Sequence, residues 1–203
     1  MIVLEMEQCT PEWFAAKAGI PGASSFDKIF TKTGQVSKQR TDYLYQLAGE
    51  RILGVCEETY SSPWMQRGKE MEDEWRDCFE LVTGHTLKQV GLCYQDERKR
   101  CLCSPDSFVQ GEKTGVEGKA PMMKTQVKYL LSGTLPTEYF CQVQGSMHVT
   151  GFEHWYFVSY YPGLPPLIIK VGRDDVWIAK FARALDEFCD ELDDITERLR
   201  KAA

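Results

Sequence analysis

The sequence lacks several features that mark common functional classes. It has no apolar run long enough to cross a bilayer, and its first nine residues carry Glu5 and Glu7 where a secretory signal would be basic and then hydrophobic. It has no glycine-rich loop ending in Gly-Lys-Ser or Gly-Lys-Thr, which argues against an ATP-driven activity. Its three histidines do not fall at metal-ligand spacing. We therefore expect a cytosolic protein with no membrane partner.

An excess of positive charge is also missing, because 24 Lys and Arg stand against 30 Asp and Glu, a formal net charge of −6. This balance argues against a non-specific DNA binder coated in basic side chains. The charges are unevenly distributed, with nine acidic and five basic residues in 174–203 but five basic residues and one acidic residue in 17–40. Any nucleic-acid surface should therefore include the N-terminal region.

Eight cysteines would indicate disulfides in a small secreted chain, but 203 residues with 43% hydrophobic content are enough for a sizeable core. No linker or composition shift divides the chain, so we expect one domain, 1–203, with reduced thiols. Cys101 and Cys103 form the only close pair in the sequence, and no second pair or nearby histidine completes a zinc site. Burial on a strand explains this pair instead.

Two carboxylates and a lysine, Asp106, Glu117 and Lys119, lie close together in the sequence. A polar turn with two glycines separates the expected strands Cys101–Val109 and Val116–Lys119, which can pair as a hairpin. Side chains alternate along a strand, so Glu117 and Lys119 share a face, and the hairpin brings Asp106 back toward Glu117. Two converging carboxylates suit Mg²⁺, which prefers oxygen ligands and keeps several waters. An exposed Glu-x-Lys is more often a solvated ion pair, so this pattern alone does not establish a site.

A further candidate carboxylate, Glu72, lies in the expected helix Pro63–Thr83. Apolar residues recur there at intervals of three and four, among them Trp75 and Phe79, and Glu72 falls on the same stripe. Burying an unpaired charge costs on the order of several kcal/mol or forces protonation, so Glu72 needs a compensating partner. A structural arginine is the commoner partner of such a glutamate, and a metal ion is the other.

Helices and strands alternate in the rest of the chain. Capping residues, glycine stops and apolar periodicity predict the helices, and runs of alternating polarity predict the strands. The expected helices are Pro11–Gly19, Ser25–Phe30, Lys38–Leu53, Met122–Leu131, Thr137–Val149 and a long one from Asp174, and the expected strands are Thr86–Gln95, Trp155–Tyr160 and Leu167–Val171.

Four short motifs occur in a fixed order between Trp13 and Thr150. They are Trp13 and Lys17 with Gly19 and Ala23-Ser24, Gly68 with Glu72, Pro105-Asp106 with Glu117-Gly118-Lys119, and YFCQVQGSMHVT at 139–150. Their order and content resemble the phage lambda exonuclease family of YqaJ-like viral recombinases, within the PD-(D/E)xK nuclease superfamily. An amphipathic helix alone explains the apolar residues of the last motif but not the order of all four.

This resemblance implies a fold and an activity. The expected fold class is α/β, with a central mixed β-sheet flanked by helices in a restriction-endonuclease-like nuclease core. The expected activity is that of a Mg²⁺-dependent 5′-to-3′ exonuclease, which processively degrades one strand of linear double-stranded DNA from a 5′-phosphorylated end. The remaining 3′ single strand would serve annealing-type phage recombination. The resemblance also implies a ring-shaped homotrimer, a single-strand annealing protein as partner, and the cytoplasm of a bacterial host.

Roles for individual residues near the metal follow from the same resemblance. Asp106, Glu117 and the Gly118 carbonyl would hold two Mg²⁺ ions, for which Mn²⁺ is an alternative. Lys119 would position or deprotonate the attacking water. Glu72 would stand near the metals.

The resemblance also implies contacts with the DNA end. Lys17, Ser24, Ser104 and Gln142 match the positions that form a pocket for the terminal 5′-phosphate. Met65 matches the hydrophobic wedge that parts the terminal base pair. These residues come from separate segments, so only folding could unite them.

Three positions depart from the family pattern, and two other functions stay open. Ser107 stands where glycine usually follows Pro-Asp, Gly118 where an aliphatic residue is usual, and Lys17 where arginine is usual. Lysine keeps the charge but loses the bidentate geometry of arginine. The alternative functions are an endonuclease of the same superfamily and a non-catalytic module that binds DNA ends or a partner protein.

Overall fold

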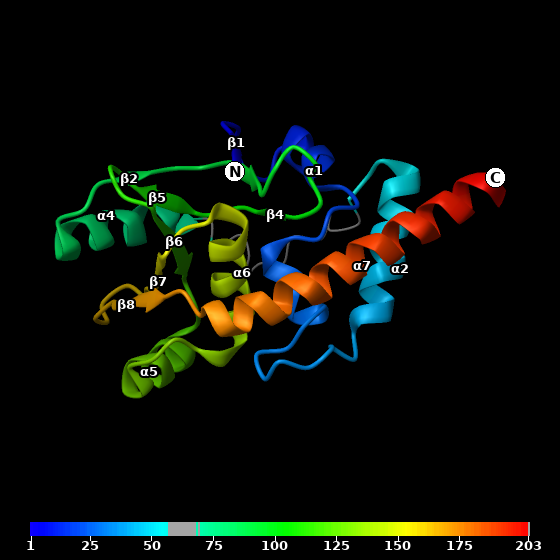
Figure 1. Cartoon of the computed structure of the whole chain (residues 1–203). Coiled ribbons are helices and arrows are strands. Elements are labelled where there is room, and N and C mark those ends of the chain that lie inside the picture. The colour runs from blue at the N-terminus through cyan, green and yellow to red at the C-terminus, as the bar shows by residue number, and fades with distance from the viewer. Residues whose placement is uncertain (57–67, 69, 203) are drawn as a thin grey trace.

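Two β-sheets and the helices around them form the structure, a computed structural model that describes residues 1–56, 68 and 70–202 (Figure 1). The strands are β1 (Ile2–Leu4), β2 (Leu87–Lys88), β3 (Leu92–Tyr94), β4 (Leu102–Cys103), β5 (Ser107–Val109), β6 (Thr114–Lys119), β7 (His154–Ser159) and β8 (Leu167–Gly172). The helices are α1 (Pro11–Lys17), η1 (Ala23–Lys28), α2 (Arg40–Leu53), α4 (Glu72–Thr83), α5 (Met123–Ser132), η2 (Thr137–Tyr139), α6 (Phe140–Thr150) and α7 (Asp175–Ala202).

The larger sheet has five strands in the order β2-β5-β6-β7-β8, and the smaller has three in the order β1-β3-β4. Strands β6 and β7 run parallel, whereas the other neighbouring strands are antiparallel. A parallel pair needs a long crossover connection, which α5, η2 and α6 provide. Helix α4 contacts β6 and β7, while α6 contacts β7 on one side and α7 on the other (Figure 1). The predicted α/β class, with a central mixed sheet flanked by helices, is confirmed.

Two of the expected strands are each divided between the two sheets. The expected strand Thr86–Gln95 is β2 of the larger sheet and β3 of the smaller one, and Cys101–Val109 is likewise β4 and β5. At Gly91 the chain passes so close to the N-terminal segment that a Cβ would lie 2.4 Å from the carbonyl oxygen of Met6. Pro105 lacks an N–H group and cannot continue a strand ladder. These two points are where the chain changes sheet.

Three expected helices differ in extent or type. Helix α4 begins at Glu72, and positions 63–67 and 69 of the expected helix Pro63–Thr83 lie outside the described residues. The expected helix Ser25–Phe30 is the 3-10 helix η1, and Thr137–Val149 is η2 followed by α6. The long C-terminal helix is α7, whose apolar residues at intervals of three and four are buried from Ile178 to Leu192, as the spacing predicts.

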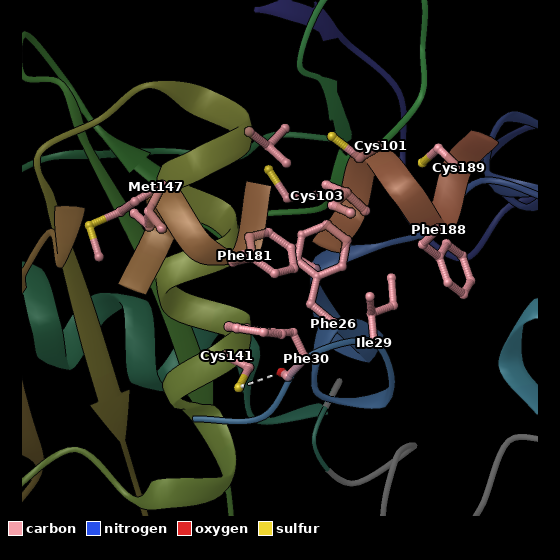
Figure 2. Close-up of a cluster of buried hydrophobic side chains, with 14 of the residues drawn as sticks. Phe26, Ile29, Phe30, Cys101, Cys103, Cys141, Met147, Phe181, Phe188 and Cys189 are labelled. Carbon is pink, nitrogen blue, oxygen red and sulfur yellow. Dashed lines mark hydrogen bonds between the residues drawn. The ribbon is translucent and has the colours of Figure 1, made fainter. Parts of the chain in front are cut away.

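The main hydrophobic core joins η1, α2, α6 and α7 (Figure 2). Gly145 allows α6 to approach η1 closely, since a Cβ there would lie 2.2 Å from the ring of Phe26. Phe181 of α7 packs on the same ring, with centroids 4.8 Å apart. All eight cysteines are free, and several line this core. The packing fixes α6 and, with it, Gln142, which lies about one turn before Gly145.

No helix in the described part of the chain is long and apolar enough to span a lipid bilayer.

Candidate active site

The β5–β6 hairpin places the Asp106 carboxylate beside the strand that carries Glu117. Ser107 pairs with Val116, and the Asp106 N–H donates to the Val116 carbonyl oxygen at 3.2 Å. The Asp106 side chain turns back onto β6, where its Oδ2 accepts a hydrogen bond from the Gly118 N–H at 2.7 Å. The backbone of β6 thus orients the carboxylate that directly precedes β5, next to Glu117.

Glu117 is almost completely buried, with 2% of its surface exposed. Its Oε1 accepts hydrogen bonds from Lys119 Nζ and, at 2.7 Å, from Gln142 Nε2. Lys119 follows on the same face of β6, whereas Gln142 reaches the carboxylate from α6. A buried carboxylate without such donors would carry a desolvation penalty on the order of several kcal/mol, so these two partners are what permit its burial.

Lys119 is held as a cation. Its side chain is 28% exposed, and its Nζ lies 5.5 Å from the ring centroid of Tyr139. Burial lowers the pKa of this ammonium group, but the charges of Glu117 and Asp106 and the hydrogen bond to Glu117 outweigh burial and raise the pKa above its usual range. In this arrangement Lys119 is a hydrogen-bond donor.

The surroundings of Asp106 disfavour its charged form, whereas those of Lys119 favour the charged form. Burial and, after it, the negative charge of Glu117 raise the pKa of Asp106 to about 7. Lys119, the Gly118 N–H and Arg76 lower it but do not cancel the increase. Two carboxylates of like charge in a partly buried place would be stabilised by a bound cation.

The oxygen donors at this site fit a hard divalent cation. The carboxylates of Asp106 and Glu117 and the Gly118 carbonyl are ligands of the kind that Mg²⁺ takes. Across the described ranges, no group of three or more His, Cys, Asp or Glu side chains is arranged to hold a metal ion. A metal here would therefore rest on one or two carboxylates, with the remaining positions left to water and phosphate oxygens, as is usual for Mg²⁺.

Glu72 is not on the buried face, contrary to expectation, because its side chain is 39% exposed in the first turn of α4. The buried stripe of this helix comprises Trp75 and Phe79. Arg76 pairs with Glu72, donating from Nη2 to Oε2 at 2.8 Å and to the Asp106 carbonyl oxygen at 3.4 Å. The partner of Glu72 is thus an arginine, and an i,i+4 ion pair this exposed contributes only about 0.3–0.5 kcal/mol.

Sequence reasoning missed three side chains at this site. Arg76 donates to the Asp106 carbonyl oxygen, Trp75 packs against β6, and Tyr139 faces Lys119. Arg76 stands four residues after the candidate glutamate, a spacing visible in the sequence but common on solvated helices. Ser107, which departs from the family pattern, is fully buried. Its Oγ lies 3.3 Å from Arg76 Nε and donates to its neighbouring carbonyl oxygen at 2.6 Å.

Two of the residues expected at a terminal phosphate follow paired segments. Gly22 bridges to Leu102 of β4 in parallel, so Ser24 and Ser104 each lie two residues beyond this bridge. Ser24 is exposed at η1. The Ser104 Oγ is buried and has no hydrogen-bond partner within the described part of the chain. A buried hydroxyl with no partner is uncommon in folded proteins.

The other two expected phosphate residues lie on elements that also pack on β4. Trp13 of α1 belongs to the same hydrophobic cluster as Leu102 of β4, and the Lys17 ammonium lies 3.9 Å from the ring centroid of that tryptophan. Helix α6 contacts β4 and carries Gln142. Met65, the expected wedge, lies outside the described residues.

Comparisons with known proteins give a matching family and similar solved structures. Residues 12–153 match the model of the YqaJ-like viral recombinase domain. The chain is similar to the alkaline exonuclease LHK-Exo from Laribacter hongkongensis, with 31% identity over 95% of this chain and 97% of that chain and a TM-score of 0.85. The structure of LHK-Exo in complex with dAMP gives 33% identity over 95% and 98% of the two chains, also with a TM-score of 0.85.

A more distant structure shares the fold alone. It is a phage-related exonuclease from Haemophilus somnus 129PT, with 15% identity over 91% of this chain and 96% of that chain and a TM-score of 0.65. No curated protein sequence matches the chain.

Proposed function

Because the chain belongs to the YqaJ-like viral recombinase family, we propose that it is a metal-dependent deoxyribonuclease and, more narrowly, a 5′-to-3′ exonuclease on linear duplex DNA. The observation that carries this proposal is the placement of Asp106, directly before β5, next to Glu117 and Lys119 of the adjacent strand β6. The similar LHK-Exo is an alkaline exonuclease, and one of its structures holds dAMP, a mononucleotide of the kind an exonuclease releases.

The metal ligands in this proposal are Asp106, Glu117 and the Gly118 carbonyl, for two Mg²⁺ ions or, alternatively, Mn²⁺. When bound, such metals lower the pKa of the attacking water and offset the negative charge that develops on the phosphate. The raised pKa of Asp106 supports the assignment, because a carboxylate that ionises with difficulty alone is stabilised by a cation.

Lys119 orients the attacking water in this proposal. Its raised pKa keeps the ammonium group protonated, which favours hydrogen-bond donation over removal of a proton. Gln142 holds Glu117 from the α6 side, so the carboxylate is fixed by donors from two elements. Glu72 stands near the metals in this proposal, which is supported by Arg76, since its guanidinium donates both to Glu72 and to the Asp106 carbonyl oxygen.

The terminal 5′-phosphate of the substrate binds Lys17, Ser24, Ser104 and Gln142. A cation, two hydroxyls and an amide can all donate hydrogen bonds to phosphate oxygens. The unpartnered Ser104 hydroxyl supports this role, since a ligand would satisfy it. Gln142 has two N–H donors and can serve both Glu117 and a phosphate.

The remaining parts of the proposal come from the family resemblance. Met65 parts the terminal base pair, and three copies of the chain form a ring through which the surviving strand passes. The enzyme acts processively in the cytoplasm of a bacterial host. The 3′ strand is handed to a single-strand annealing protein during phage recombination.

Digestion of a linear duplex labelled at a 5′-phosphorylated end tests the proposal. With Mg²⁺, the 5′ label should be released early as mononucleotides, while a 3′ label on the same strand should be released late. EDTA should stop both releases, and a covalently closed circle of the same sequence should stay intact. Cleavage of the circle would assign an endonuclease instead. Binding to linear ends without any cleavage in Mg²⁺ or Mn²⁺ would indicate a non-catalytic module.

A further inference from the structure

The proposed chemistry assigns no step to Arg76, although this residue contacts several groups at the candidate site. Its side chain is 13% exposed. Its Nη2 donates to Glu72 Oε2 at 2.8 Å and to the Asp106 carbonyl oxygen at 3.4 Å, and its Nε donates to Ser107 Oγ at 3.3 Å. One guanidinium therefore contacts a candidate metal-site glutamate and the backbone of a candidate metal ligand.

Helix α4 holds this guanidinium in place. The Arg76 guanidinium carbon lies 5.1 Å from the ring centroid of Trp75, and Nη1 donates to Asp73 at 3.2 Å. Trp75 is 1% exposed and packs against Gly118 of β6. Two neighbouring residues of α4 thus contact the two strands of the site. Arg76 contacts Ser107 at the start of β5, and Trp75 contacts Gly118 of β6, between Glu117 and Lys119.

We propose that Arg76 is a positioning residue, which fixes the backbone at Asp106 relative to the Glu72 carboxylate so that the site is preorganised for its metal. The inference rests on the function proposed above. A guanidinium is planar and presents its donors in a fixed fork, so it can serve Glu72, the Asp106 carbonyl and Ser107 together. A lysine ammonium is a point charge that keeps the charge but not this geometry.

The contacts themselves indicate that positioning, rather than stability, is the main contribution of Arg76. The bonds from Arg76 to Ser107 and to the Asp106 carbonyl oxygen are long, at 3.3 and 3.4 Å, and the Glu72 partner is substantially exposed. Bonds of this length and pairs of this exposure add little to folding. Removing a group that orients a metal ligand without touching the metal typically lowers metal affinity or activity by about 10- to 100-fold.

Arg76→Gln and Arg76→Lys, compared with wild type, test this inference. Three quantities are measured for each: Mg²⁺ affinity by calorimetry without DNA, the Mg²⁺ concentration at half-maximal cleavage, and the metal-free melting temperature. Arg98→Gln is the matched control, because Arg98 pairs with Asp96 at the surface and is 70% exposed. We expect both Arg76 variants to bind Mg²⁺ about tenfold more weakly, with the half-maximal concentration raised in proportion. Their melting temperatures should stay within a few degrees of wild type, and the control should match wild type throughout.

Several outcomes would overturn the inference. Wild-type Mg²⁺ affinity in Arg76→Gln would show that Arg76 positions nothing, and full affinity in Arg76→Lys would show that only its charge matters. If Arg76→Gln does not fold, Ser107→Ala removes one acceptor of the fork while keeping Arg76, and unchanged Mg²⁺ affinity there would also contradict the inference. A wild-type protein that neither binds Mg²⁺ nor cuts DNA would contradict the proposed function itself. Failure of the Arg76 inference looks different, because wild type is then active and the variants bind Mg²⁺ as it does.

Discussion

Gly118 lies directly against the indole of Trp75, so that a Cβ on Gly118 would be 2.2 Å from Trp75 Cε2. This contact joins α4 to the residue between Glu117 and Lys119. The indole fills the space that the aliphatic side chain usual in the family pattern would occupy. The departure at Gly118 is therefore compensated by a large residue on the neighbouring helix.

Gly118→Val is expected to destabilise the protein by about 1–3 kcal/mol, because overpacking a filled core forces neighbouring atoms to shift. Gly172→Val is the matched control, since Gly172 is also a strand glycine and a Cβ there meets nothing within 4 Å. Combining Gly118→Val with Trp75→Leu should cost less than the sum of the two single changes. Urea unfolding measures all four variants, and strictly additive losses would contradict a direct contact.

Asp106→Asn is expected to stabilise the metal-free protein at high pH. Folding raises the pKa of Asp106 from 3.8 to about 7, so the folded state binds this proton more tightly than the unfolded chain does. The resulting stability is fully present below pH 3.8 and is lost as the pH rises through about 7. The asparagine side chain carries no charge at either pH. The melting temperature of the variant relative to wild type should therefore rise by roughly several degrees between pH 5 and pH 8.

Thermal unfolding in EDTA measures this difference. Added Mg²⁺ should then raise the melting temperature of wild type at pH 8 but not that of Asp106→Asn. The same difference between the two proteins at both pH values would contradict the electrostatic account of Asp106.

Lys119→Ala is expected to lose cleavage while keeping DNA affinity, because the proposed role of Lys119 is to orient the attacking water and not to bind the DNA phosphates. Misplacing a reacting group commonly costs about 100-fold in rate, and we expect at least that loss. Lys113→Ala, an exposed lysine of the same hairpin, is the control. Single-turnover cleavage and filter binding separate the two effects. A loss confined to binding would reassign Lys119 to a phosphate contact.

Lys17→Ala is expected to remove most of the preference for a 5′-phosphorylated end over a 5′-hydroxyl end. Lys28→Ala is the control, because Lys28 is another N-terminal lysine over an aromatic ring, with its Nζ 5.1 Å from the Tyr43 centroid. Digestion rates on both kinds of end, at one salt concentration, give the preference for each protein. Equal rates for the two ends in wild type would show that the phosphate pocket has been assigned wrongly.

Features that depend on short stretches of sequence were predictable. A polar turn between alternating strands is enough to bring Asp106 back toward Glu117, and the hairpin forms with Ser107 opposite Val116. The long C-terminal helix likewise follows from its apolar spacing. The roles assigned to these carboxylates stay predictions, since geometry alone does not test them.

Features that depend on contacts between distant segments were not predictable from one sequence. The division of Thr86–Gln95 between two sheets reflects the close approach of Gly91 to Met6. The exposure of Glu72 follows from its place in the first turn of α4, which periodicity does not fix. In the sequence, the spacing of Arg76 and Glu72 indicates only a common helical ion pair. The contact of Arg76 with the Asp106 backbone depends on the fold.

Cleavage of linear duplex DNA by Glu117→Gln is the most direct test of the central claim. Glutamine keeps an oxygen for the hydrogen bonds from Lys119 and Gln142 but removes the charge that a metal needs. We predict that wild type degrades a 5′-phosphorylated linear duplex in Mg²⁺, whereas the folded variant shows no detectable degradation at any Mg²⁺ concentration. Near-normal degradation by Glu117→Gln would contradict a metal-dependent nuclease site at Asp106 and Glu117.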